Sequence, residues 1–157
     1  MRTTESPPLA SPIPFAPAQR TTQTVTIDRE GQTHRMLCIL ELGPRGLVLV
    51  AFTELGQRLF TIEYGPDKFS IDTSPVLPPR FDAKLVLADL QLVYWPLKLL
   101  QESLNDGWSV TESQPNAVRR LMHDGQVVAE AHHDADGTID IQRASLGYRM
   151  TIAAVAN

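Results

Sequence analysis

Cysteine is almost absent from this chain, which has only Cys38 among its 157 residues. A single cysteine excludes any disulfide within the chain. Because Cys38 lies inside the apolar run RMLCILEL, we expect it to be buried and to behave as a small hydrophobe. The residues before it, Arg35, Met36 and Leu37, do not match a lipid-attachment site, which follows the apolar region of a signal peptide and a small residue.

Long hydrophobic runs and clusters of positive charge are also missing. No apolar run approaches the ~18 residues that a membrane-spanning helix needs. The 14 basic residues are scattered among 18 acidic ones, for a net charge of −4. We expect no nucleic-acid partner, because phosphate binding needs concentrated Lys and Arg. Hydrophobic residues make up 43% of the chain, enough for the core of one globular domain.

Motifs for catalysis are likewise missing. Ser109, Ser113 and Ser145 lack a GxSxG elbow, and the chain has no GxGxxG or GKS string. The carboxylates Glu54 and Glu63 have no nucleophile or oxyanion site marked beside them. We therefore predict a protein that is not an enzyme, with no catalytic residues and no cofactor.

A cluster of four possible metal ligands occurs at His132, His133, Asp134 and Asp136. The four residues lie on both sides of a predicted Asp-Gly hairpin, and no fifth ligand is spaced to help them. The alternative is a solvated turn, and we predict no metal site. His34 and His123 stand alone in predicted strands, where surface or core-edge positions are expected.

The hydrophobic pattern from Thr22 onward predicts strands separated by turn signals. The first set comprises residues 22–28, 32–41, 47–53, 57–64 and 68–72. Apolar spacing then becomes helical from Asp82, a candidate N-cap, and Pro96 separates this helix from a second one that stops at Gly107. A second set of strands follows at 108–112, 117–123, 126–132, 138–143 and 148–155.

Five strands, a helical insert and five more strands together indicate the fold. A long antiparallel sheet curls, and an apolar insert is suited to fill its concave side. We predict a mainly β (α+β) fold, a half-open barrel of about ten strands with the helical insert in its hollow. Residues 1–21, which hold five of the 12 prolines, are expected to form an unpaired, flexible tether, and residues 22–157 a single domain.

Apolar residues fall on both faces of adjacent strands. In residues 36–40, for example, Met36, Cys38 and Leu40 oppose Leu37 and Ile39. Such strands fit either an ordinary core or a cavity with an apolar lining. The candidate ligand-contacting residues are Met36, Leu40, Leu49, Phe52, Phe60, Ile62, Leu90, Tyr94, Trp95, Leu97 and Leu100.

Three stretches carry a resemblance to a known family: TELGQRLFTIEY at 53–64, LADLQLVYWPLKLL at 87–100 and IDIQRASLGYRMTI at 139–152. They resemble an uncharacterised family of LolB-like lipoproteins often encoded in aryl-polyene gene clusters, and more weakly LolB, the outer-membrane receptor for lipoproteins. The resemblance implies a LolA/LolB-type half-barrel that accepts acyl chains. It also implies that Leu55, beside Gly56 at a hairpin tip, contacts lipid, although Glu54 stands where that family commonly has proline.

The function implied is a non-enzymatic periplasmic protein that binds or relays a lipid or lipoprotein, with aryl-polyene lipid export or assembly as one setting. In its native form such a protein is anchored to the inner leaflet of the outer membrane through a lipidated cysteine that follows a signal peptide, and we expect both to be absent from this sequence. The alternative is a scaffold with a closed half-barrel that docks export or biosynthesis proteins.

Overall fold

A computed structural model describes residues 9–79, 81–113 and 117–155 of the chain. It contains ten strands in one antiparallel sheet and two α-helices, in the order that the sequence predicts, and one short 3₁₀ helix where the sequence indicates only a turn. The strands are β1 (Gln19–Arg29), β2 (Gln32–Gly43), β3 (Gly46–Phe52), β4 (Arg58–Gly65), β5 (Lys68–Thr73), β6 (Trp108–Ser113), β7 (Val118–His123), β8 (Gln126–His133), β9 (Ile139–Arg143) and β10 (Tyr148–Ala154). The helices are α1 (Ala83–Tyr94), α2 (Leu97–Ser103) and η1 (Ala144–Leu146).

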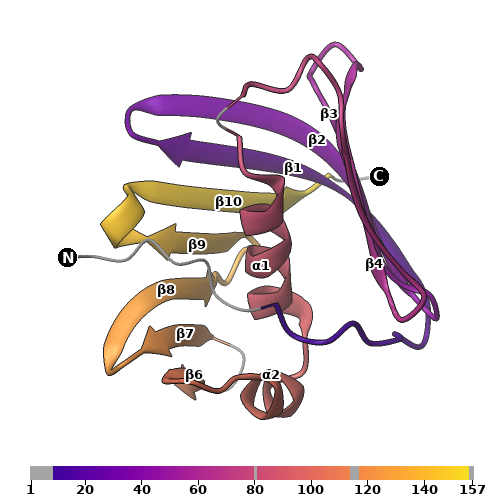
Figure 1. The fold of residues 1–157 in the computed structure, drawn as a ribbon. Helices are drawn as coiled ribbons and strands as arrows, with labels where there is room; N and C mark the ends of the chain where they lie inside the picture. Colours follow the sequence, from indigo (N-terminus) through magenta and orange to yellow (C-terminus); the bar gives the residue numbers. More distant parts are fainter. Residues whose placement is uncertain (1–8, 80, 114–116, 156–157) are drawn as a thin grey trace.

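The sheet consists of two meanders joined through the first and last strands. Its order is β5-β4-β3-β2-β1-β10-β9-β8-β7-β6, so β5 and β6 are the two edges of the sheet that the described residues form. Figure 1 shows the sheet curving around α1 without closing into a barrel. The curved, half-open arrangement therefore matches the predicted architecture.

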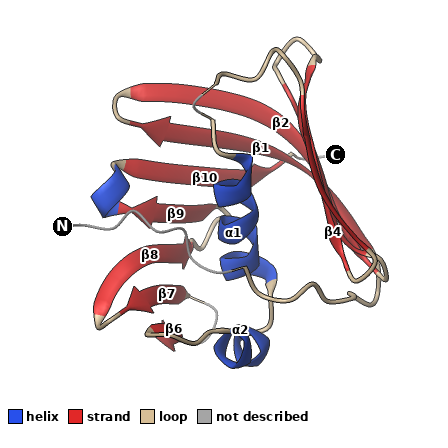
Figure 2. Ribbon diagram, in the orientation of Figure 1, coloured by secondary structure: helices blue, strands red, loops and turns tan. Residues whose placement is uncertain are grey.

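This topology explains why the helices lie inside the curve. The chain leaves the sheet at the edge strand β5 and must reach the opposite edge strand β6, so the connection has to cross one face of the sheet, and it crosses the concave one (Figure 2). Figure 2 shows α1 and α2 on that side of the strands. The helical insert thereby covers the apolar face that the curled sheet presents.

Helix α1 begins and ends where the sequence predicts. The Asp82 carboxylate accepts a hydrogen bond of 3.1 Å from the backbone N–H of Leu85 and so caps the first turn. Pro96 follows the helix and starts α2. Nine of the twelve α1 residues are buried, as expected for a helix that is apolar most of the way round.

Alternation along the strands fixes which side chains face the helix. In β3, Leu47, Leu49 and Ala51 are buried while Val48 and Val50 are half-buried. In β2 the buried side chains Met36, Cys38 and Leu40 also alternate with more exposed neighbours. Cys38 is 1% exposed, as its apolar context indicates.

The N-terminal segment differs from the unpaired tether that the prolines suggest. Strand β1 already begins at Gln19, and the backbone N–H of Phe15 donates to the carbonyl of Gly43. The Ala10 backbone exchanges two hydrogen bonds of 3.0 Å with the Gln91 side chain of α1. Proline leaves the carbonyls of an extended segment free to accept such bonds, so a proline-rich segment can dock without pairing as a strand.

Aromatic side chains also hold residues 10–15 against the end of α1. The Tyr64 hydroxyl donates to the Ala10 carbonyl at 2.5 Å, and the Trp95 indole donates to the Ser11 carbonyl at 3.0 Å. Phe15 packs edge-on against Trp95 with ring centroids 5.2 Å apart. Residues 9–15 are therefore part of the packed domain, whereas residues 1–8 lie outside the described structure.

Helices of the described residues are all too short or too polar to cross a membrane.

Candidate functional site

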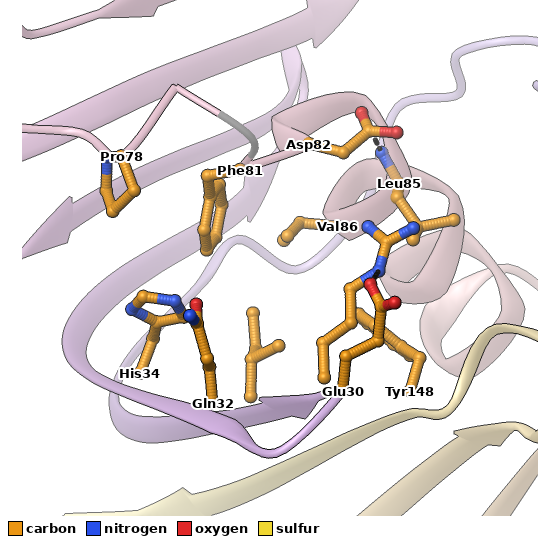
Figure 3. Close-up of a pocket in the computed structure, with 11 residues that line it drawn as sticks. Glu30, Gln32, His34, Pro78, Phe81, Asp82, Leu85, Val86 and Tyr148 are labelled. Atoms are coloured by element: carbon orange, nitrogen blue, oxygen red, sulfur yellow. Dashed lines mark hydrogen bonds and ion pairs between the residues drawn. The ribbon is translucent and has the colours of Figure 1, made fainter.

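A cavity lies at the mouth of the half-barrel, between the β1–β2 hairpin and the start of α1. Its volume is about 550 Å³, within the range of ~300–1,000 Å³ typical of small-molecule sites. Figure 3 shows His34 and Gln32 of β2 on one side of it and Phe81 and Val86 on the other. The cavity is thus bounded by the sheet and by the helical insert together.

One wall of the cavity belongs to the insert and is apolar apart from Asp82. Phe81 packs against the buried ring of Phe60, with centroids 5.4 Å apart, and meets His34 edge-on at 6.2 Å. Leu85 and Val86 of α1 continue this wall. A hydrocarbon chain placed here would contact carbon on the side of the insert.

The opposite wall becomes more polar toward the hairpin. Arg29 is two residues beyond the buried Ile27, so strand alternation turns its side chain to the same concave face. In the sheet register Arg29 lies opposite Tyr148 on β10 and Gln32 on β2, and all three line the cavity. The cavity therefore has an apolar inner part and a polar rim.

Charges at this rim are mixed. Glu30 and Asp82 supply two carboxylates, and Arg29 supplies a cation. The Arg29 Nε atom lies 3.9 Å from the nearest Glu30 carboxylate oxygen, beyond hydrogen-bond distance. Among the described residues this buried Nε has no hydrogen-bond partner, which costs about 1–3 kcal/mol for a buried donor.

A buried polar network, which we call the cavity floor, adjoins the cavity through Tyr148. Arg143 on β9 donates twice to one carboxylate oxygen of Asp89 on α1, at 2.9 and 2.7 Å, and the Tyr148 hydroxyl donates to the other at 2.6 Å. Asp89 and Arg143 are 0% and 1% exposed. Because Tyr148 also lines the cavity, this network connects the cavity floor to α1.

Burial perturbs the protonation of this network. It raises the pKa of Asp89, and the Arg143 guanidinium and the Tyr148 hydroxyl oppose that rise. Burial and the adjacent Asp89 carboxylate raise the pKa of Tyr148 well above its usual value. Tyr148 therefore remains a neutral hydrogen-bond donor at physiological pH.

None of the eleven predicted ligand-contacting residues lines this cavity, and most of them are packed into the core. Tyr94 and Leu97 are partly buried against the core. The eight that are at most 4% exposed are Met36, Leu40, Leu49, Phe60, Ile62, Leu90, Trp95 and Leu100. The centre of the hollow is thus filled by the protein's own side chains, and ligand contact by these residues stays a prediction.

Phe52 lies on the face of β3 that also carries Val48 and Val50, as the alternation of the strand predicts, and ligand contact by Phe52 stays a prediction. Its spacing of three from Leu49 is odd, and strand alternation gives it the half-buried character of Val48 and Val50. It is paired in register with Leu37, which is 40% exposed. Phe52 is therefore placed with the outer apolar side chains of β2 and β3, outside the hollow.

The tip between β3 and β4 exposes its leucine. Leu55 is 91% exposed, and Gly56 has a left-handed φ of +90°. The turn is closed by hydrogen bonds of 2.8 and 2.9 Å between the backbones of Thr53 and Gln57 and of Gly56 and Thr53. The tip is accessible for contact with another surface.

The histidine and aspartate cluster around 132–136 is engaged in local contacts. The His132 ring nitrogen is 3.1 Å from Glu130, and Asp136 accepts from the backbone N–H of Thr138 at 2.9 Å. No three His, Cys, Asp or Glu side chains of the described residues are placed to hold a metal ion. His123 is 3.6 Å from Asp124 in an exposed hairpin, away from the cavity residues.

Sequence reasoning missed the residues of the cavity rim and floor. Arg29 continues the inward series of Val25 and Ile27, a signal that the alternation alone contains. Asp89 within the apolar stretch LADLQLV and Arg143 at the end of IDIQR were also readable as two buried charges in need of partners. Their pairing was not readable, because they lie 54 residues apart on different elements.

An open, curved antiparallel sheet that holds helices in its hollow, with a cavity at its mouth, defines the structural class of this protein. The chain belongs to the DUF3261 family, described as proteins of unknown function, whose model matches residues 20–156. A solved structure of a DUF1329 family protein from Desulfovibrio piger is similar over 88% of this chain and 83% of that one, at 8% identity and a TM-score of 0.36. No curated protein matches the sequence.

Proposed function

We propose that the protein binds an acyl chain or a similarly elongated apolar molecule at the mouth of its half-barrel and passes it on without bond chemistry. The cavity of about 550 Å³ between the β1–β2 hairpin and α1 carries this proposal. The resemblance to LolB-like lipoproteins supports the same function. It further suggests a periplasmic protein, lipid-anchored to the outer membrane, that relays a lipid or a lipoprotein.

The energetics of such a carrier are adequate for reversible transfer. Burying each CH₂ contributes ~0.8 kcal/mol, so about ten methylenes offer up to ~8 kcal/mol before ordering costs. A free energy of that size corresponds to about micromolar affinity. A membrane offers the same burial, so contact with a membrane suffices for release.

A route from cavity to membrane runs along one end of the molecule. The exposed Leu55 lies at the β3–β4 tip, and the backbone N–H of Ser74 bonds to the carbonyl of Leu59 at the base of that tip. From Ser74 the loop leads past Val76, which is 46% exposed, to Phe81 on the cavity wall. We propose that Leu55 and Val76 contact the membrane during transfer, and that aryl-polyene lipids or their precursors are one class of cargo.

Native mass spectrometry tests the carrier function. The domain is purified without detergent from a Gram-negative periplasm, and bound lipid is extracted and identified. We expect a stoichiometric acyl-bearing ligand that is lost in Gln32→Trp, which fills the cavity from an exposed position. The control Arg35→Trp adds the same ring at an exposed position outside the cavity residues and should retain the ligand.

Vesicle transfer tests the tip. Leu55→Glu should slow transfer of a bound fluorescent fatty acid to vesicles, whereas Gln57→Glu adds the same charge to the same turn and keeps the leucine. Equal rates for both variants would remove Leu55 from the proposal.

A scaffold with a filled half-barrel is the second candidate. The packing of the eight buried residues named above favours it, because they leave the centre of the hollow occupied. A clean ligand-free mass that stays unchanged after incubation with lipids and polyene extracts would establish this alternative.

A further inference from the structure

We propose that Arg29 is the headgroup contact of this site and that the ligand presents an acyl oxygen, a carboxylate or an ester carbonyl, to its guanidinium. This inference rests on the proposed function, since it specifies the chemistry of the molecule bound in the mouth cavity. It also places the ligand, with its polar end at the β1–β2 hairpin and its chain directed toward α1.

The backbone around Arg29 holds its side chain at the rim. Arg29 ends β1 and is paired on both sides, with Gln32 of β2 and with Tyr148 of β10. The following turn is tied to the neighbouring loop, because the backbone N–H of Glu30 donates to the carbonyl of Gly147 at 3.2 Å. The backbone of Arg29 is therefore fixed by pairing among three strands, with its side chain on the cavity side.

The hydrogen bonding of Arg29 is incomplete within the described residues. Its buried Nε atom makes a 3.9 Å ion pair with the Glu30 carboxylate but no hydrogen bond, and the side chain as a whole is 36% exposed. Buried donors in folded proteins nearly always have a hydrogen-bond partner, so this Nε beside a cavity is suited to an acceptor on a bound molecule, which would compete with the Glu30 carboxylate for the guanidinium. Arg143, the other arginine beneath this site, has both Nε and Nη2 bonded to Asp89.

The surrounding charges limit what that acceptor is. Glu30 and Asp82 line the same cavity, so a doubly charged phosphate monoester would face two carboxylates for one guanidinium. A singly charged carboxylate or a neutral ester carbonyl meets less repulsion and still accepts a charge-assisted hydrogen bond.

The apolar wall then accommodates the chain. Ile27 adjoins Arg29 on the concave face, and Phe81 and Val86 stand across the cavity from strand β2 (Figure 3). An amphiphile with its carboxyl end at Arg29 would therefore bury its first methylenes against these three residues.

The test compares amphiphiles that share a twelve-carbon chain and differ at the head. Dodecanoate, methyl dodecanoate, dodecyl phosphate and dodecyltrimethylammonium are titrated below their micelle concentrations by calorimetry. The wild-type protein should bind dodecanoate about tenfold or more tighter than dodecyltrimethylammonium, the change that one charge-assisted hydrogen bond produces. Arg29→Met should abolish that preference, and Arg29→Lys should retain part of it.

The ratio between headgroups is the decisive readout, because a loss of folding would weaken all four probes together. The control Arg35→Met removes the same charge at an exposed position outside the cavity residues and should leave the ratio unchanged. If Arg29→Met lowers the affinity for methyl dodecanoate as much as that for dodecanoate, the natural acceptor is an ester carbonyl. If it lowers the affinity for dodecanoate alone, the natural acceptor is a free acid.

Two results would overturn the inference in different ways. If all probes bind and Arg29→Met leaves their ratios unchanged, or if dodecyl phosphate binds tightest, Arg29 does not select an acyl oxygen and the carrier function stands. If none of the four probes binds to the wild-type protein, the proposed function itself fails.

Discussion

The Arg143 guanidinium on β9 donates two hydrogen bonds, of 2.9 and 2.7 Å, to one carboxylate oxygen of Asp89 on α1. Both residues are almost fully buried. The pair joins the helical insert to the C-terminal half of the sheet. Because a displaced α1 would leave both charges unpaired in the core, the pair selects one position of the helix in the hollow.

Breaking this pair should be costly. Asp89→Leu leaves the buried Arg143 guanidinium without its counter-charge, and we expect a loss of about 3–5 kcal/mol in the free energy of unfolding, measured with urea. Adding Arg143→Met should recover part of the loss. As a control, Glu41→Gln breaks the exposed Arg20–Glu41 pair, at 3.6 Å, and should cost less than about 1 kcal/mol. Equal costs for Asp89→Leu and Glu41→Gln would contradict the structural role of the buried pair.

Gly46 at the start of β3 should not tolerate a side chain. A Cβ there would lie 2.3 Å from the carbonyl oxygen of Tyr64 and 2.7 Å from the Cα of Gly65, and φ is +103°. Gly56 has φ of +90° and open space around it, so Gly56→Ala should cost only the backbone strain of about 1–2 kcal/mol. Gly46→Ala adds the clash and should exceed this value by at least ~1 kcal/mol in urea unfolding. A larger loss for Gly56→Ala than for Gly46→Ala would show that the backbone at the start of β3 moves to make room for the added methyl group.

Cys38 should be chemically silent in the folded protein. Burial raises the pKa of its thiol to about 12, so almost no thiolate is present at pH 8. Ellman's reagent should label the native protein slowly and the urea-unfolded protein with one equivalent, because the chain has a single cysteine. Rapid labelling at pH 8 without denaturant would mean that β2 opens readily.

The same thiol makes stability depend on alkaline pH. Its folded pKa of about 12 lies above the value of 9.0 for an unperturbed thiol, so its contribution is complete below pH 9 and is lost as pH rises toward 12. Cys38→Ala should therefore show a shallower decline in unfolding free energy over this window than the wild-type protein. The tyrosines are common to both proteins and cancel in the comparison.

The docked N-terminal segment should contribute to stability. Gln91→Leu leaves the buried N–H of Ala10 without its acceptor, and we expect a cost of about 1–3 kcal/mol together with faster amide hydrogen exchange at Ala10. Gln101→Leu is the matched control. The Gln101 side chain also donates to a backbone carbonyl, that of Val110, but Gln101 is exposed, so its loss should lower the free energy of unfolding less. If amide exchange at Ala10 is unchanged in Gln91→Leu, the N-terminal segment is not held by this contact, as expected for an unpaired tether.

The sequence by itself determined the elements of this fold. Alternation and Gly turns define the ten strands, and Asp82 and Pro96 delimit α1, because these signals act over a few residues of backbone geometry. The order of two meanders around a helical insert also followed, since antiparallel neighbours are joined by short turns.

Only the tertiary structure decided where space remains inside the sheet. Interior positions predicted to contact ligand, such as Trp95 and Phe60, are buried in the core, while a cavity lies at Arg29 and Phe81, which the sequence did not single out. Packing depends on side chains brought together from distant strands, as does the pairing of Asp89 with Arg143. A periodic pattern specifies which face a residue occupies, but it does not specify which partner reaches that face or whether any gap is left.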